Sequence, residues 1–269
     1  MTTAGTTELL DLAREVALTA GRLVRQRRAE GVEVAASKSS PEDIVTFADR
    51  ESETLIRSLL AKSRPDDGFF GEESDADAGS SGLTWVVDPI DGTVNFLYGI
   101  PHYAVSIAVV EGDPDPATWR ALAGAVVNPA IGEVFTATDG GGAFLGEHQI
   151  RVAPAVDLSQ ALVGTGFSYS ASKRLSQAAI VAQLIGQVRD IRRIGTASLD
   201  LCSVACGRLN AYYERGLKPW DHAAGALVAQ EAGAAVRGLR GAAATAEFLL
   251  AAEPSVAAEL ERVLLGYGV

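Results

Sequence analysis

The chain has 269 residues, of which 48% are hydrophobic, enough for a sizeable packed core. Its formal net charge of −11 argues against nucleic acid as the main partner, because binding to a phosphate backbone depends on clustered Lys and Arg. The sequence has no run of about 18 apolar residues, and its N-terminal segment, MTTAGTTELLDLAREV, lacks the basic region that opens a signal peptide. We therefore expect no membrane partner.

The first half of the chain combines helices with a run of strands. Apolar residues recur at helical spacing over 7–29. A loop or loose hairpin over 30–43 and a second helix over 46–60 follow. Short strands are expected in GFFGEES and LTWVVD, and the pattern over 103–152 predicts an antiparallel meander. We treat residues 1–152 as an N-terminal α+β lobe.

The second half alternates strands and helices. Strands are predicted at 161–167, 191–195, 209–214 and 247–252, and each precedes a helix, at 172–187, 196–207, 220–232 and 254–265. Residues 153–269 are therefore predicted to form an α/β lobe, packed closely on the first.

Cys202 and Cys206 share one face of a predicted helix, with no CxxC motif or nearby His to make a metal site. Buried, reduced thiols are expected, which indicates a cytoplasmic protein.

An acidic segment, DPIDGT, follows the predicted strand that ends at Val87. Its proline predicts a turn that would point the carboxylates of Asp88 and Asp91, together with the Ile90 carbonyl, into one space. Oxygen atoms of this kind are the ligands that hard divalent cations prefer. Gly92 and Thr93 then open a possible helix whose backbone N–H groups would attract a phosphate. A divalent metal beside such an anion site is suited to phosphoryl transfer.

Two further acidic residues have simpler explanations when each is considered alone. Glu72, in GEES, could be a solvated loop residue after a short strand. Asp221, in WDHAAG, could simply cap its helix. Their combination with DPIDGT is what indicates a common site.

The motifs GEES, WVVDPIDGTVNF and PWDHAAGALVAQEAGA occur in an order that resembles the inositol monophosphatase family, which are magnesium-dependent, lithium-sensitive phosphatases. KSSPEDIVTFAD and IGTASLDLC also match, so the resemblance covers nearly the whole chain. It implies a fold of class α+β or α/β, a layered αβαβα sandwich with an antiparallel N-terminal sheet and a mixed C-terminal sheet. It also implies two or three Mg²⁺ ions per active site and a homodimer.

The resemblance also assigns roles to individual residues. The metal ligands would be Glu72, Asp88, the Ile90 carbonyl, Asp91 and Asp221. Gly92 and Thr93 would offer backbone N–H groups to the phosphate. Thr93 would pair with Asp49 near the attacking water, which Glu72 and Thr93 would orient and help deprotonate. Lys38 matches a residue on the family's mobile loop.

The substrate is implied by a separate set of residues. Substrate contacts would come from Asp91, Gly195, Thr196, Ala197, Glu214 and Asp221, and a carboxylate such as Glu214 suits the hydroxyls of a polyol. We expect hydrolysis of inositol monophosphate to inositol and phosphate. Histidinol phosphate, fructose 1,6-bisphosphate and a 3′-phosphonucleotide remain alternative substrates. A non-enzymatic partner of RNA-processing or transcription machinery also remains open, although a scaffold would have little reason to keep four metal-binding carboxylates.

Overall fold

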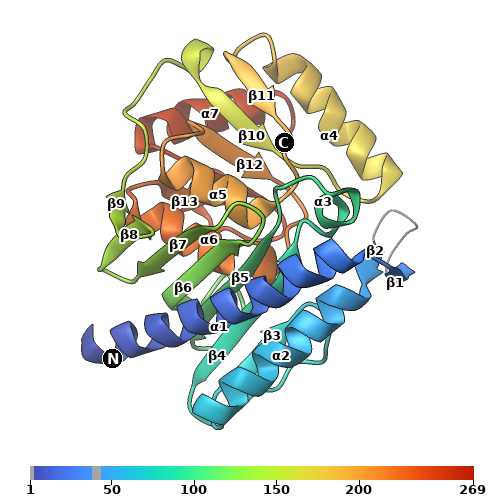
Figure 1. The fold of residues 1–269 in the computed structure, drawn as a ribbon. Helices are drawn as coiled ribbons and strands as arrows, with labels where there is room; N and C mark the ends of the chain where they lie inside the picture. The colour runs from blue at the N-terminus through green and yellow to red at the C-terminus, as the bar shows by residue number, and fades with distance from the viewer. Residues whose placement is uncertain (1–2, 38–43) are drawn as a thin grey trace.

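The computed structural model describes residues 3–37 and 44–269 (Figure 1). Two long helices, α1 (Thr3–Glu30) and α2 (Phe47–Ser63), come first in the chain. Between them β1 (Val34–Ser37) and β2 (Ile44–Thr46) pair antiparallel, as the expected hairpin requires. Lys38, predicted on a mobile loop, lies outside the described residues.

The larger sheet has seven strands in the order β3-β4-β5-β6-β7-β8-β9. They are β3 (Gly68–Gly71), β4 (Leu83–Asp91), β5 (Ala104–Glu111), β6 (Arg120–Asn128), β7 (Glu133–Thr138), β8 (Gly142–Leu145) and β9 (His148–Ile150). The meander predicted over 103–152 is confirmed, since β5 to β9 pair antiparallel. β4 also pairs antiparallel with β5, but β3 pairs with β4 in parallel. The parallel pair forms because the connection between them, residues 72–82, returns the chain to the same end of the sheet.

The smaller sheet is mixed, in the order β11-β10-β12-β14-β13. Its strands are β10 (Leu162–Thr165), β11 (Asp190–Arg192), β12 (Ala211–Glu214), β13 (Ala235–Arg237) and β14 (Leu249–Ala252). β10 is parallel to β11 and β12, whereas β14 is antiparallel to both of its neighbours. The sequence did not predict β13, whose three residues are all half-buried and show no alternation.

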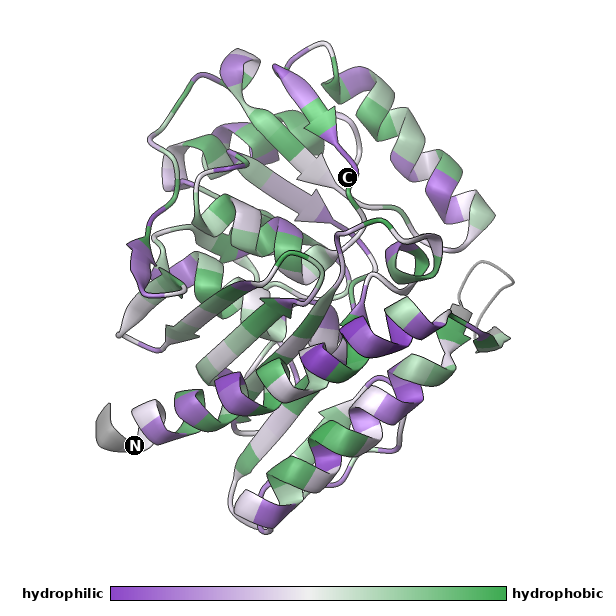
Figure 2. Cartoon of the chain, viewed as in Figure 1, coloured by the Kyte–Doolittle hydropathy of each residue, from purple (hydrophilic) through white to green (hydrophobic). Residues whose placement is uncertain are grey.

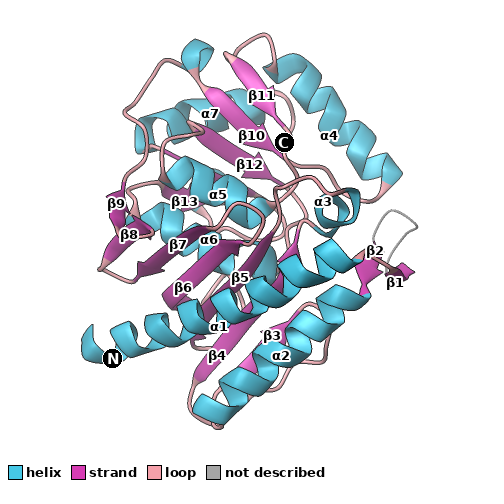
Figure 3. Ribbon diagram, viewed as in Figure 1, coloured by secondary structure: helices cyan, strands magenta, loops and turns pink. Residues whose placement is uncertain are grey.

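Helices and sheets stack in five layers (Figures 1 and 3). α1 and α2 cover one face of the larger sheet, and α5 (Ala197–Ala205) and α6 (Pro219–Glu231) lie between the two sheets. α4 (Ala171–Leu184) and α7 (Pro254–Gly266) lie on the outer side of the smaller sheet. The predicted αβαβα sandwich is therefore confirmed. The lobe boundary at 152/153 stays a prediction, because α6 contacts both β13 and strands β4 to β8.

Hydrophobic patterning explains these layers. In α1, the residues Leu9, Ala13, Val16, Ala20 and Val24 recur every three or four positions and are buried against the sheet. Figure 2 shows hydrophilic residues alternating with hydrophobic ones along α1 and α2, the pattern of helices with one solvated face. Thr46 caps α2 and exchanges hydrogen bonds with Asp49, which fixes where that helix begins.

Small residues allow the central helix layer to approach the larger sheet closely. A Cβ atom on Gly124 of β6 would lie 3.1 Å from the Cα of Ala224 in α6. The remaining short elements are α3 (Thr93–Tyr98) and the 3₁₀ turns η1 (Leu158–Gln160) and η2 (Leu239–Gly241). Among the helices of the described chain, none has the length and apolar character that crossing a bilayer requires.

Candidate active site

Asp88 and Asp91 belong to the end of strand β4 rather than to the turn that the sequence predicted. β4 continues to Asp91, and its register against β5 shifts between Asp88, opposite Ser106, and Asp91, opposite Ala104. Three steps along β4 thus match two along β5, so β4 carries one extra residue, a β-bulge that tolerates Pro89. Side chains three apart on a regular strand face opposite sides, and the extra residue brings both carboxylates to the same side.

This bulge forms one wall of a cleft of about 250 Å³. The expected metal ligands Glu72, Asp88, Ile90, Asp91 and Asp221 all line it. So do the expected phosphate residues Gly92 and Thr93 and the expected substrate residues Gly195, Thr196, Ala197 and Glu214. The structure therefore brings together residues from β4, the segment after β3, and α5, β12 and α6.

Burial and mutual repulsion dominate the electrostatics of the carboxylates. Burial raises the pKa of Asp88 well above its usual range, and the neighbouring Glu72, Asp91 and Asp221 raise it further. Burial also raises the pKa of Asp221, and the negative charge of Glu72 makes the next largest contribution. The pKa of Asp91 rises to about 7 through burial, although hydrogen bonds from Ser198 oppose the rise.

Each of the three aspartates accepts a hydrogen bond from a backbone N–H group. The N–H of Ser198 donates to Oδ2 of Asp91 at 2.7 Å, and the Ser198 hydroxyl donates to the same oxygen. The N–H of Lys218 donates to Oδ2 of Asp221 at 2.6 Å at the start of α6. The N–H of Ile90 donates to Oδ1 of Asp88 at 3.1 Å within the bulge. These bonds fix the carboxylates at the cleft without neutralising them.

The donor set fits hard divalent cations. Carboxylate oxygens and a backbone carbonyl are the ligands that Mg²⁺ takes, and a cation would relieve the repulsion that raises these pKa values. In the part of the chain that the structure describes, no three acidic, His or Cys side chains are gathered closely enough to enclose an ion. The four carboxylates come from β4, the segment after β3 and α6, and would have to move closer around a bound cation.

Asp49 lies behind the cleft and reaches it through Thr93. Oγ1 of Thr93 lies 3.1 Å from Oδ1 of Asp49 and 3.0 Å from the Ile90 carbonyl oxygen, so its proton can be donated to either. Asp49 is fully buried, and burial raises its pKa to about 6 despite hydrogen bonds from Thr46. The expected pair of Thr93 and Asp49 is thus within hydrogen-bonding distance.

A polar cluster joins the two halves of the cleft. Oγ1 of Thr196 donates to the His102 carbonyl at 2.7 Å, and Nδ2 of Asn95 donates to the carbonyls of His102 and Ile194. Gly92 faces this cluster with φ +89°, and a Cβ atom there would lie 2.3 Å from Oγ1 of Thr196. Glycine is therefore required where the segment before α5 meets the segment before α3.

Glu214 lines the cleft from the end of β12. The Tyr212 hydroxyl donates to its Oε2, and Gly166 leaves room for the carboxylate, since a Cβ at that position would lie 2.0 Å from Oε2. Burial raises the pKa of Glu214 to about 7, while Tyr212 and Arg193 oppose the rise.

Sequence reasoning missed several residues at this site. Ser198 holds Asp91, and Arg193, Lys218 and Tyr169 line the cleft. Glu53 is 2% exposed and accepts a hydrogen bond of 2.8 Å from the N–H of Glu73, next to Glu72. The hydroxyl of Ser198 one residue after Ala197 was an available signal, whereas nothing local in the sequence distinguishes Arg193 from Arg192.

Comparison with known proteins gives a consistent assignment. The sequence profile of the inositol monophosphatase family matches residues 6–266. Mycobacterium leprae inositol-1-monophosphatase is 45% identical, over 93% of this chain and 91% of its own length. The solved structure of Mycobacterium tuberculosis SuhB superposes with a TM-score of 0.81 at 44% identity, covering 97% of both chains. The Nus factor SuhB of Xylella fastidiosa is 45% identical over 74% of this chain and 70% of its own. The chain belongs to the inositol monophosphatase family.

Proposed function

We propose that this protein is a magnesium-dependent phosphomonoesterase that hydrolyses inositol monophosphate to inositol and phosphate. The observation that carries the proposal is the convergence of Glu72, Asp88, Asp91 and Asp221 on one cleft, where burial and mutual repulsion raise the pKa values of the three aspartates. Such a set is costly to bury unless cations occupy it. Family membership and relatives named inositol-1-monophosphatase support the same reaction.

The metal-holding residues in this proposal are the four carboxylates and the Ile90 carbonyl, which line the cleft together. Mg²⁺ bound there would neutralise the phosphate and lower the pKa of a nearby water molecule. Two or three ions would suit this number of oxygen ligands. Magnesium as the metal, and the number of ions, are part of the proposal.

Activation of water is assigned to Thr93 and Asp49. When Oγ1 of Thr93 donates its proton to Asp49, its lone pairs are left to accept a proton from water in the cleft. A base with a pKa of about 6 is ionised at neutral pH and can still take up a proton. Glu72, which also lines the cleft, would orient the water. The N–H groups of Gly92 and Thr93 would bind the phosphate.

Substrate recognition is assigned to the wall of the cleft formed by the segment before α5 and the end of β12. Gly195, Thr196, Ala197 and Glu214 line it and would contact the inositol ring, with Asp91 and Asp221 nearer the phosphate. None of histidinol phosphate, fructose 1,6-bisphosphate and a 3′-phosphonucleotide has a carbocycle with a hydroxyl on every remaining carbon, which is what this wall would bind in inositol monophosphate. We expect each to be hydrolysed at least about tenfold less efficiently in kcat/KM.

The non-enzymatic alternative has one observation in its favour, which is the Nus factor name of the Xylella relative. A protein that only binds a partner gains nothing from carboxylates buried at one cleft, so we favour the enzyme. We also propose a homodimer and a cytoplasmic location. The location rests on the two free cysteines, of which Cys202 is fully buried.

The test is release of phosphate from inositol 1-phosphate by the purified chain, with Mg²⁺ present and after its removal by EDTA. A panel of the three alternative substrates at matched concentration assigns specificity. Preference for histidinol phosphate would refute the substrate while leaving the reaction intact. Failure to release phosphate from every polyol or sugar phosphate would refute the enzyme.

A further inference from the structure

Arg193 lines the cleft and lies immediately after β11. It lines the cleft beside Glu214, and its guanidinium lies over Gly195, where a Cβ atom would come within 2.3 Å of Nη1. Gly195, with φ +98°, therefore leaves room for the arginine to extend into the cleft. Lys218 is the other basic residue among the described residues that line this cleft.

Two carboxylates, Glu214 and Asp200, lie close enough to Arg193 to feel its positive charge. Burial raises the pKa of Glu214 and also that of Asp200, which is 1% exposed in the first turn of α5, and the positive charge of Arg193 opposes both rises. Arg193 forms no hydrogen bond and no close ion pair with another residue in the described part of the chain. Its neighbour Arg192 is different, because it is bound to Asp190 at 2.5 Å. The donors of Arg193 are thus left available to a molecule in the cleft.

We propose that Arg193 is a specificity-determining residue, which with Glu214 binds one ring hydroxyl of the substrate. An ionised carboxylate only accepts hydrogen bonds, and a guanidinium only donates them. A hydroxyl does both, so it can donate to Glu214 and accept from Arg193 at the same time. This part of the wall therefore selects a neutral, hydroxyl-bearing leaving group.

Charged groups fit the same place less well. A second phosphate or a carboxylate at this position would gain from Arg193 but would face Glu214, and a substrate amine would face Arg193. Either would place a charged group of the substrate against a like charge of the protein instead of in a hydrogen bond. The inference rests on the proposed function, because it names what the same cleft recognises in a polyol phosphate.

The test uses Arg193→Met, which keeps the length of the side chain and removes its donors. Because the bond is made to a hydroxyl remote from phosphorus, it stabilises the bound substrate and the transition state alike. Loss of one charge-assisted hydrogen bond should raise KM for inositol 1-phosphate about 10- to 100-fold with kcat within about twofold. Arg193→Lys, which retains a donor in different geometry, should recover part of the loss.

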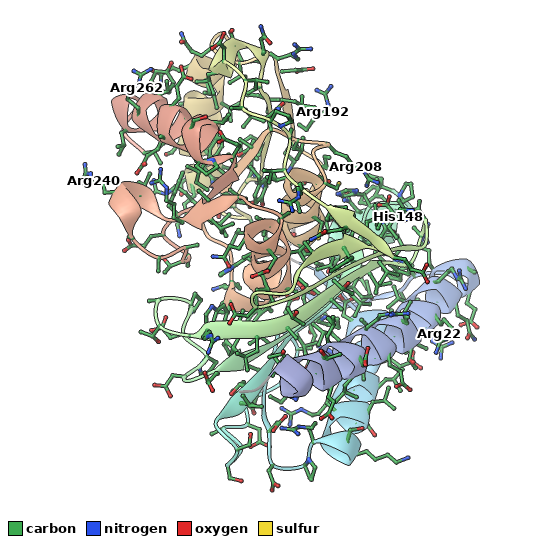
Figure 4. The ribbon with its side chains drawn as sticks, turned by 90° about the vertical axis from the view of Figure 1, so that its left-hand side faces the viewer. Arg22, His148, Arg192, Arg208, Arg240 and Arg262 are labelled. Atoms are coloured by element: carbon green, nitrogen blue, oxygen red, sulfur yellow. The ribbon has the colours of Figure 1, made fainter. Side chains whose placement is uncertain are left out.

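A second measurement distinguishes the loss of a contact to a ring hydroxyl from the loss of a contact to the phosphate. Inorganic phosphate occupies the phosphate site but has no ring, so its inhibition constant should be unchanged in Arg193→Met. Arg192→Met is the matched control, because Arg192 is the neighbouring residue and lies at the surface (Figure 4). This variant should leave both KM for inositol 1-phosphate and the inhibition constant of phosphate unaltered.

Two results would overturn the inference. If KM for inositol 1-phosphate is the same in Arg193→Met and wild type, Arg193 does not contact the substrate. If KM and the phosphate inhibition constant rise equally, Arg193 acts on the phosphate and not on a hydroxyl. Absence of activity in the wild-type protein would refute the proposed function itself, which distinguishes that failure from these two.

Discussion

Replacing Asp91 with asparagine should make the metal-free protein more stable while abolishing activity. Asp91 is 8% exposed, and its Oδ2 accepts hydrogen bonds from the N–H and the hydroxyl of Ser198. An asparagine oxygen can accept the same two bonds, so the variant keeps this contact. What it removes is a buried negative charge close to Asp88, Glu72 and Asp221.

The size of the effect follows from the pKa of Asp91, which rises from 3.8 to about 7 on folding. The folded state then binds the proton more tightly than the unfolded state, so stability falls as pH increases between these two values. Each tenfold change in the proton affinity of Asp91 corresponds to about 1.4 kcal/mol. The negative charge of Asp91 therefore destabilises the folded protein by up to about 4 kcal/mol above pH 7. Between about pH 5 and pH 8, ionisation of Asp91 should lower the free energy of unfolding of the wild type by about 3 kcal/mol.

The assay is thermal or denaturant unfolding in EDTA at about pH 5 and pH 8. We expect the Tm of Asp91→Asn to exceed that of wild type, and by more at pH 8 than at pH 5. This gain in Tm should be roughly 6–12 °C larger at pH 8 than at pH 5. Asp113→Asn, at an exposed position, is the control and should show no such pH dependence. If Asp91→Asn is no more stable than wild type at pH 8, the carboxylates do not repel one another as described.

Four further predictions concern individual residues of the cleft. Thr93→Val should lower kcat about 10²- to 10⁴-fold, whereas Thr93→Ser, which keeps the hydroxyl, should stay within about tenfold of wild type in steady-state assays. Asp49→Asn should lower kcat and remove the rise of activity through about pH 6, because asparagine has no proton to lose; an unchanged pH–rate profile would exclude Asp49 as the base. Gly92→Ala should reduce both Tm and activity, since the new Cβ would meet Oγ1 of Thr196 at 2.3 Å, and retention of both would contradict the tight contact. Ser198→Ala should leave Asp91 with one donor instead of two and raise its pKa further, so the Mg²⁺ concentration that gives half-maximal activity should increase more at pH 6 than at pH 8.

Much of the site could be anticipated because its residues occur in short local motifs. Asp88, Ile90, Asp91, Gly92 and Thr93 are consecutive or nearly so, and their spacing alone indicated shared chemistry. Glu72 and Asp221 were ambiguous individually, since a loop carboxylate and a helix cap have the same local pattern. The fold resolves the ambiguity by bringing the ends of β3 and β4 beside the start of α6.

Other features depend on tertiary structure and could not be obtained from local pattern. A proline between two aspartates is typical of a turn, yet pairing with β5 keeps Asp88–Asp91 in the strand as a bulge. The parallel partner β3 is set by the path of the segment after it, which has no sequence signature. Arg193 and Arg192 are identical neighbours, and only the packing of Gly195 and the position of Glu214 show which one enters the cleft.

The central claim is that four carboxylates at one cleft hold the metal required for phosphate-ester hydrolysis. It is tested most directly by phosphate release from inositol 1-phosphate after EDTA treatment and stepwise return of Mg²⁺, in wild type and Asp221→Asn. We expect activity in wild type to disappear and return with Mg²⁺, and Asp221→Asn to remain inactive although it folds. Metal-independent hydrolysis, or full activity of Asp221→Asn at the same Mg²⁺ concentration, would contradict the account.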